Sequence, residues 1–201
     1  MAVIHPIEKK SYQILSDQFD FSGFDNFQQA VAKRVVHATA DFDMARSITF
    51  SHRAVENGVA AIRSQAPVIC DVEMVRAGIT KYPTSCYLSQ AKSRETGLPT
   101  RSYAAMTMAA KAHPTGAIFV IGCAPTALFA LLELATSPGF QPALIIGLPV
   151  GFVGAADSKM QLVESSLPFV TNVGDKGGSA AACAAFNALL ALATSQDNDD
   201  I

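Results

Sequence analysis

The stretch Ala117-Ile-Phe-Val-Ile-Gly-Cys-Ala-Pro-Thr126 decides the fold class, because it passes from an apolar run to turn formers and then into a helical pattern. A short apolar run of this kind is typical of a strand that is buried on both faces. The same succession follows Ala143–Val150 and Leu167–Thr171, and Pro67–Val72 is another such strand. Recurring strand, turn and helix predict βαβ units, and therefore an α/β fold with a mainly parallel sheet.

The N-terminal third predicts helices instead. One helix begins after Asp25 and repeats its apolar residues every four positions up to Val35, and Asp41 opens a second. Ser51 is expected to cap a third helix, in which Gly58 costs up to about 1 kcal/mol relative to Ala and indicates a close approach of backbone.

Two further helices are expected in the second half. Residues 80–100 predict a surface loop with a short strand near Ser85–Leu88, and the first helix then runs from Arg101 to Ala112. The last helix, Ser179–Leu192, is almost entirely Ala, Leu and Phe, so it must be buried either in its own subunit or against another. Residues 195–201 are expected to fray at the end of a single domain that spans residues 1–201.

Composition excludes several classes of protein. The 201 residues are 50% hydrophobic and 16% charged. The length suits one domain, and a surface with so little charge predicts an oligomer that buries part of it. A formal net charge of −2 and the lack of a basic run argue against nucleic acid as a partner. The four dispersed cysteines predict no zinc site and suit reduced thiols in the cytoplasm. No apolar run is long enough to cross a membrane, and the first residues do not resemble a signal peptide.

A ligand site is expected where the parallel strands end, since ligands of open α/β sheets bind at the carboxyl ends. Four clusters follow the predicted strands there: Asp71–Gly78, Gly122–Thr126, Gly147–Gly154 and Asn172–Ser179. Residues 174–179, Gly-Asp-Lys-Gly-Gly-Ser, match neither a P-loop nor a dinucleotide motif, so a tight turn with Ser179 as helix cap is the simpler interpretation. A nucleotide-dependent enzyme is an alternative that rests on these glycines alone.

Three side chains are candidate functional groups. His37 near the end of a helix could exchange a proton at neutral pH, although a lone histidine there is more often structural. Arg101 at a helix start is unfavourable against the helix dipole unless it holds an anion, and it could equally be an ordinary surface residue. Ser11 is most simply a cap or a surface hydroxyl.

Several phrases along the chain together resemble one family. They are His5-Pro-Ile-Glu8 with Ser11, Arg34-Val-Val-His-Ala-Thr39 with Asp41, Asp71-Val with Met74-Val75 and Gly78-Ile79, Thr100-Arg-Ser102, Ala124-Pro-Thr-Ala-Leu128, Gly147-Leu-Pro-Val-Gly-Phe-Val153 with Ser158-Lys159, and Lys176-Gly-Gly-Ser179 with Asn187-Ala-Leu-Leu190. In this order they resemble the precorrin-8X methylmutase family over roughly residues 5–192.

The resemblance implies a three-layer α/β/α domain with a Rossmann-like sheet, acting as a homodimer in cobalamin biosynthesis. The family moves a methyl group from C11 to C12 of a polycarboxylate tetrapyrrole, precorrin-8X or cobalt-precorrin-8, giving hydrogenobyrinate or cobyrinate. This intramolecular shift implies no cofactor, external methyl donor or metal ligand from the protein. His37 corresponds to the family's catalytic histidine, which is implicated in protonating the macrocycle. The substrate-binding set implied by the same phrases is Ser11, Thr39, Arg101, Thr126, Gly151, Lys176, Gly177 and Ser179.

Two positions depart from the family pattern. Cys123 stands where the family usually has Asn, and Asp175 stands where it usually has Arg. The first exchange replaces an amide by a weakly polar thiol, and the second replaces a cation by an anion. They motivate a second hypothesis, a corrinoid-binding protein of the same family with weak or no turnover.

Overall fold

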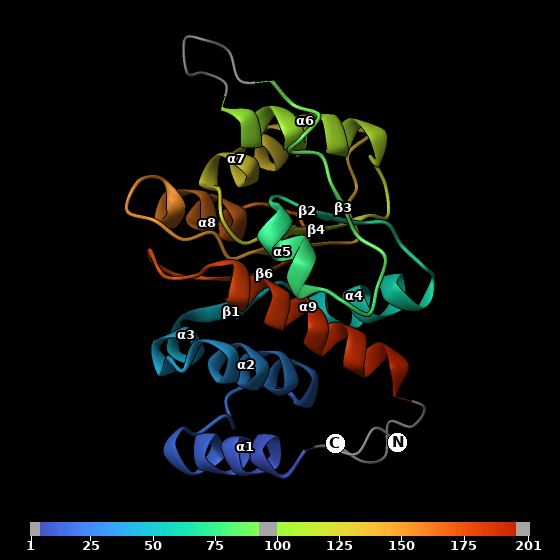
Figure 1. Cartoon of the computed structure of the whole chain (residues 1–201). Coiled ribbons are helices and arrows are strands. Elements are labelled where there is room, and N and C mark those ends of the chain that lie inside the picture. The colour runs from blue at the N-terminus through green and yellow to red at the C-terminus, as the bar shows by residue number, and fades with distance from the viewer. Residues whose placement is uncertain (1–4, 93–99, 196–201) are drawn as a thin grey trace.

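The computed structural model describes residues 5–92 and 100–195, and within them the strands form one six-stranded sheet in the order β1-β6-β5-β4-β2-β3 (Figure 1). The strands are β1 (Ile48–Phe50), β2 (Val68–Cys70), β3 (Ser85–Cys86), β4 (Ile118–Ile121), β5 (Leu144–Gly147) and β6 (Phe169–Asn172). All neighbouring pairs are parallel except β1 with β6. The predicted α/β class and mainly parallel sheet are confirmed.

The five parallel strands have the doubly wound order 2-1-3-4-5, in which the direction of winding reverses between β2 and β4. The edge strand β1 was not predicted. It has only three residues and lies between helices, so helical periodicity on both sides hides it, and its pairing partner β6 is more than a hundred residues away. An edge strand this short is defined by its partner rather than by its own sequence.

Helices cover both faces of the sheet. They are α1 (Pro6–Gln18), α2 (Asn26–Thr39), α3 (Phe42–Ser47), α4 (Ala54–Arg63), α5 (Glu73–Gly78), α6 (Arg101–Ala112), α7 (Pro125–Leu134), α8 (Ala155–Glu164) and α9 (Ser179–Thr194). Helices α6, α7 and α8 lie above the sheet in Figure 1, whereas α4 and α9 lie below it, with α2 and then α1 beyond α9. Helix α5 packs against α9. The three-layer arrangement with additional N-terminal helices is thus confirmed.

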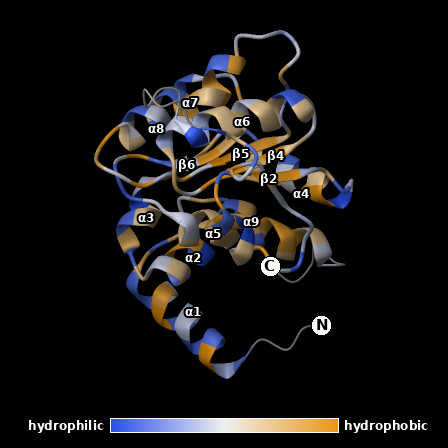
Figure 2. Cartoon of the chain, turned by 45° about the horizontal axis from the view of Figure 1, so that its top comes forward, coloured by the Kyte–Doolittle hydropathy of each residue, from blue (hydrophilic) through white to orange (hydrophobic). Residues whose placement is uncertain are grey.

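The strands β2, β4, β5 and β6 contribute alternate side chains to two separate apolar cores. Ile118 and Val120 of β4 face the core shared with α2, α4 and α9, whereas Phe119 and Ile121 face the core shared with α6 and α7. All four side chains have no exposed surface, and Figure 2 shows the strands as the hydrophobic centre of the molecule. Burial on both faces explains why these strands are continuous apolar runs.

Two predicted helix caps are wrong. Helix α4 begins after Arg53, which has a left-handed φ of 55° and no side-chain cap, while the Ser51 hydroxyl accepts a bond from the Phe169 N–H at 2.8 Å. Helix α9 begins after Gly178, so Ser179 is its first residue and not its cap. The caps at Asp25 and Asp41 are confirmed, because each carboxylate accepts a backbone N–H of its own first turn.

Helix α9 is buried within its own chain. It packs against α2, α4 and α5 and against the sheet, and ten of its residues are buried without any second subunit. Gly58 of α4 permits this approach, since a Cβ there would come within 3.0 Å of a methyl group of Leu189 in α9. The apolar character of α9 therefore needs no subunit interface to explain it.

No helix in residues 5–92 and 100–195 is long and apolar enough to cross a membrane. The expected short strand near Ser85 and the helix from Arg101 are confirmed. Residues 93–99 of the expected surface loop and most of the expected frayed end, residues 196–201, lie outside the described residues.

Candidate functional site

The four predicted clusters meet at one edge of the sheet, because β2, β4, β5 and β6 run in the same direction. Main-chain bonds join the loops that follow β5 and β6: the Gly151 N–H donates to the Asp175 carbonyl at 3.1 Å, and the Gly178 N–H donates to the Leu148 carbonyl at 2.8 Å. A Cβ at Gly177 would overlap the carbonyl oxygens of Leu148 and Pro149, so only glycine permits this contact.

The buried side chain of Asp71 holds the loop after β4 from its inner side. This side chain is 2% exposed and follows β2 directly, at the point where the strand order reverses. Its carboxylate accepts the N–H groups of Gly122 at 3.1 Å, Cys123 at 2.8 Å and Ala124 at 2.9 Å. Burial raises the pKa of Asp71, and the three backbone donors oppose that rise by stabilising the ionised form.

Lys159 holds the loop after β6 by donating hydrogen bonds, whereas Asp71 accepts them. Its side chain, on α8, has no exposed surface. The ammonium donates to the Asn172 Oδ1 at 3.0 Å and to the Lys176 carbonyl at 2.6 Å. Burial lowers the pKa of Lys159 to about 8, and the neighbouring Asp175 opposes this shift.

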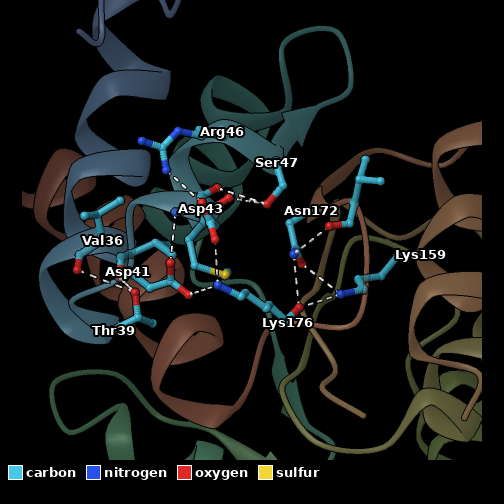
Figure 3. Close-up of polar contacts among 12 residues, drawn as sticks. Val36, Thr39, Asp41, Asp43, Arg46, Ser47, Lys159, Asn172 and Lys176 are labelled. Atoms are coloured by element: carbon cyan, nitrogen blue, oxygen red, sulfur yellow. Dashed lines mark hydrogen bonds and ion pairs between the residues drawn. The ribbon is translucent and has the colours of Figure 1, made fainter. Parts of the chain in front are cut away.

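Lys176 extends from that loop toward the N-terminal helices. Its Nζ lies 2.7 Å from Asp41 Oδ2 and 2.8 Å from Asp43 Oδ2, and Figure 3 shows the side chain reaching across to both carboxylates. Asp41 follows the end of α2 by two residues and caps α3. The predicted substrate-binding cation is thus paired with two carboxylates of the chain itself.

His37 and Ser11, which are 26 residues apart in sequence, come together between α1 and α2. The Ser11 Oγ lies 2.9 Å from the His37 Nδ1, and the ring of Tyr12 stacks on the imidazole with centroids 4.9 Å apart. The Arg34 guanidinium, one turn before His37, binds both the Tyr12 hydroxyl at 3.2 Å and Glu8 at 2.7 Å. His37 is half-buried, and because its Nδ1 bonds to Ser11, its Nε2 is the ring nitrogen without a protein hydrogen bond among the described residues.

Arg101 lies in a different layer. It is exposed at the first position of α6, which packs on the opposite face of the sheet from α2 (Figure 1). Beside it, the Thr100 hydroxyl caps α6 and donates to the Thr126 hydroxyl at 2.8 Å. Within residues 5–92 and 100–195 no ion pair involves Arg101. The structure therefore does not bring Arg101 into contact with the His37 cluster.

Thr39 is engaged locally, because its hydroxyl donates to the Val35 carbonyl at 2.9 Å within α2. The two departures from the family pattern are both exposed: Cys123 after β4 and Asp175 after β6. Each loop keeps its main-chain anchor, since Asp71 and Lys159 bind backbone groups that any residue would supply. No group of three or more His, Cys, Asp and Glu side chains suited to a metal ion occurs in the described part of the chain.

Sequence reasoning missed the residues that hold these groups in place: Tyr12, Asp41 and Asp43 as partners, and Asp71 and Lys159 as buried anchors. Asp71 carried a signal, because an acidic residue directly after a buried strand lies at the carboxyl edge. Lys159 carried only its membership of the Ser158-Lys159 phrase. Nothing in a helical lysine indicates that its ammonium is buried.

Comparison with known proteins gives a consistent result. Residues 6–192 match the sequence model of the family described as precorrin-8X methylmutase. The cobalt-precorrin-8 methylmutase of Priestia megaterium is 40% identical over 94% of this chain and 88% of its own length. The precorrin-8X methylmutase of a Sinorhizobium species is 40% identical over 91% and 92% of the two chains. A crystal structure of precorrin-8X methylmutase from Thermus thermophilus superposes with a TM-score of 0.84 at 35% identity, covering 94% of this chain and 98% of its own.

Proposed function

The chain belongs to the precorrin-8X methylmutase family and is an isomerase of cobalamin biosynthesis, and we propose that His37 is the acid of its methyl shift. The reaction moves a methyl group from C11 to C12 within precorrin-8X or cobalt-precorrin-8. The pairing of Ser11 with the His37 Nδ1 is the observation that carries this assignment.

The geometry supports a proton donor for a physical reason. A methyl group migrates when the macrocycle is held in a protonated tautomer, so the site must deliver one proton near neutral pH. Ser11 engages the Nδ1, and Tyr12 and Arg34 restrict the tilt of the ring, which leaves the Nε2 as the atom that faces a ligand. General acid help of this kind is worth about 10²–10⁴-fold in rate.

We assign the carboxylates of the substrate to the sheet edge. Arg101 supplies a guanidinium that can bind a carboxylate with two bonds, and Thr126, Gly151, Gly177 and Ser179 lie where helices α7, α8 and α9 begin. Lys176 differs from these residues, since its ammonium already binds Asp41 and Asp43. Its contribution is to hold the loop that presents Gly177.

We also propose that the chain is a single domain, that it acts in the cytoplasm and that it forms a homodimer. Large apolar side chains are exposed on the loops after β5 and β6, where Phe152 is 97%, Val153 89% and Val173 69% exposed. A sparse surface charge and exposed apolar side chains of this kind are typical of a surface that is covered in the assembly. Sedimentation at micromolar concentration should give the mass of two chains, and a monomeric mass would overturn the dimer.

The test of the function is a single-turnover measurement. Purified protein in excess over precorrin-8X, and separately over cobalt-precorrin-8, should convert the spectrum of the added substrate into that of hydrogenobyrinate or cobyrinate. Comparing the two substrates tells which one the enzyme prefers. A corrinoid-binding protein without turnover, the alternative motivated by Cys123 and Asp175, would retain the ligand and leave its spectrum that of the substrate.

A further inference from the structure

Lys159 is a buried cation to which the proposed chemistry gives no role. Its side chain has no exposed surface and reaches from α8 to the end of β6 and the loop that follows, where the ammonium makes its hydrogen bonds. A buried charge costs free energy unless its hydrogen bonds are satisfied, so the groups that Lys159 binds show what it holds in place. What it holds is the main chain at Lys176.

Three hydrogen bonds link Lys159, Asn172 and the Lys176 carbonyl to one another. The Lys176 carbonyl accepts from the Lys159 ammonium at 2.6 Å and from the Asn172 amide at 3.0 Å, and the Asn172 Oδ1 accepts from the same ammonium at 3.0 Å. Two donors on one carbonyl fix the position of the Lys176 backbone. Figure 3 shows Lys159 and Asn172 converging on this carbonyl from α8 and the end of β6.

The Lys176 side chain links this fixed stretch of backbone to the N-terminal helices. Its Nζ binds Asp41 and Asp43, which lie at the corner between α2 and α3. His37 lies in the last turn of α2, and the Ala40 N–H closes that turn on the Val36 carbonyl at 2.8 Å. A displacement of Lys176 would therefore act on the turn that carries the proposed acid.

We propose that Lys159 is a positioning residue of the methyl shift, which holds the Lys176 main chain so that the Lys176 side chain fixes the α2–α3 corner beside His37. The rate effect expected here rests on the proposed function, whereas the structural link to His37 does not. The burial-lowered pKa of Lys159, about 8, leaves the ammonium largely charged at neutral pH.

The experiment measures His37 directly. The ring signals of His37 are recorded by ¹⁵N NMR in the wild type and in Lys159→Met, which keeps an unbranched side chain as far as Cε and removes the ammonium with its donors. The matched control is Leu162→Ala on the same helix, equally buried but packed against Gly147 in β5. We expect Lys159→Met to shift the His37 signals, and Leu162→Ala to lower the thermal midpoint while leaving those signals in place.

Steady-state kinetics and a double-mutant cycle complete the test. Lys159→Met should lower kcat about tenfold, with a smaller change in KM, because small misplacement of reacting groups is costly in rate. In a Lys176→Met background, Lys159→Met should add little to either readout, since both act through one link. If Lys159→Met fails to fold, Lys159→Gln, whose amide keeps donors at a shorter reach, takes its place in every measurement.

Three results would overturn the proposal: His37 signals and kcat that are unchanged in the Lys159 variant, full additivity with Lys176→Met, or an equal response in Leu162→Ala. Failure of the proposed function is distinct from these, because then the wild type itself would not convert the substrate. The His37 signals would still report whether Lys159 acts on the α2–α3 corner.

Discussion

The His37 cluster and the loops at the sheet edge are held in opposite ways. Ser11, Tyr12 and His37 touch one another directly on the surfaces of two packed helices. The loops after β4 and β6 are instead held from behind, each by one buried ionisable side chain, Asp71 or Lys159, that binds the backbone.

The difference follows from the task of each region. A proton donor must keep one orientation, which direct side-chain neighbours provide. Loops that receive a large ligand need a free front surface, so their hydrogen bonds are best satisfied on the inner side. The two anchors have opposite charge because Asp71 accepts three N–H groups, whereas Lys159 donates to a carbonyl and an amide oxygen.

Removing the anionic anchor should have the largest effect. Asp71→Ala leaves three N–H groups without their acceptor, one of them on the buried Gly122, and we expect a loss of about 3 kcal/mol in the free energy of unfolding. Asp71→Asn retains one acceptor oxygen and should lose less. Urea denaturation measures both, and an unchanged midpoint for Asp71→Ala would mean that the loop is held by other contacts.

The contribution of Lys159, the cationic anchor, to the free energy of unfolding should depend on pH. The pKa of Lys159 is about 8 in the folded chain and 10.5 for a free lysine, so the unfolded chain binds more protons between these values. Stability contributed by this residue therefore rises with pH from 8 to 10.5, by roughly 3 kcal/mol at most. The difference in unfolding free energy between the wild type and Lys159→Met should follow this rise. A difference that is constant over this range would contradict the burial of a charged Lys159.

The His37 cluster should respond in rate more than in stability. Ser11→Ala removes the partner of the His37 Nδ1, and we expect kcat to fall about tenfold, equivalent to about 1.4 kcal/mol of barrier. Ser16→Ala, an exposed position on the same helix, is the matched control. Wild-type kcat in Ser11→Ala would show that the bond does not orient the imidazole for the reaction.

The smallest effect concerns the front surface of a loop. Asp175 is exposed, and exchanging it for the cation usual in the family should lower KM by about threefold, in line with the small energy of exposed charge pairs. Asp175→Arg is compared with Asp175→Ala, which removes the negative charge without adding a positive one. If neither variant changes KM, the side chain at 175 does not face the substrate.

Sequence alone predicted the five parallel strands but not the edge strand β1, because an apolar run such as residues 117–123 is typical of a strand that is buried on both faces. It failed at two of the helix caps, since the observed cap residues Arg53 and Gly178 depend on backbone φ rather than on side-chain preference. The resemblance assigned Ser11 and His37 to one site, but their direct contact is a finding of the structure, since periodicity does not relate residues 26 apart. The Lys176 pairs, across more than 130 residues, were beyond both kinds of reasoning.

The central claim is that His37 donates the proton of the methyl shift, and His37→Asn tests it most directly. Asn keeps a hydrogen-bonding side chain but cannot act as a general acid, so the variant should bind substrate like the wild type and keep its thermal midpoint. Its single-turnover rate should fall by about 10²–10⁴-fold. A His37→Asn protein that is less stable but converts bound substrate at the wild-type rate would contradict the account.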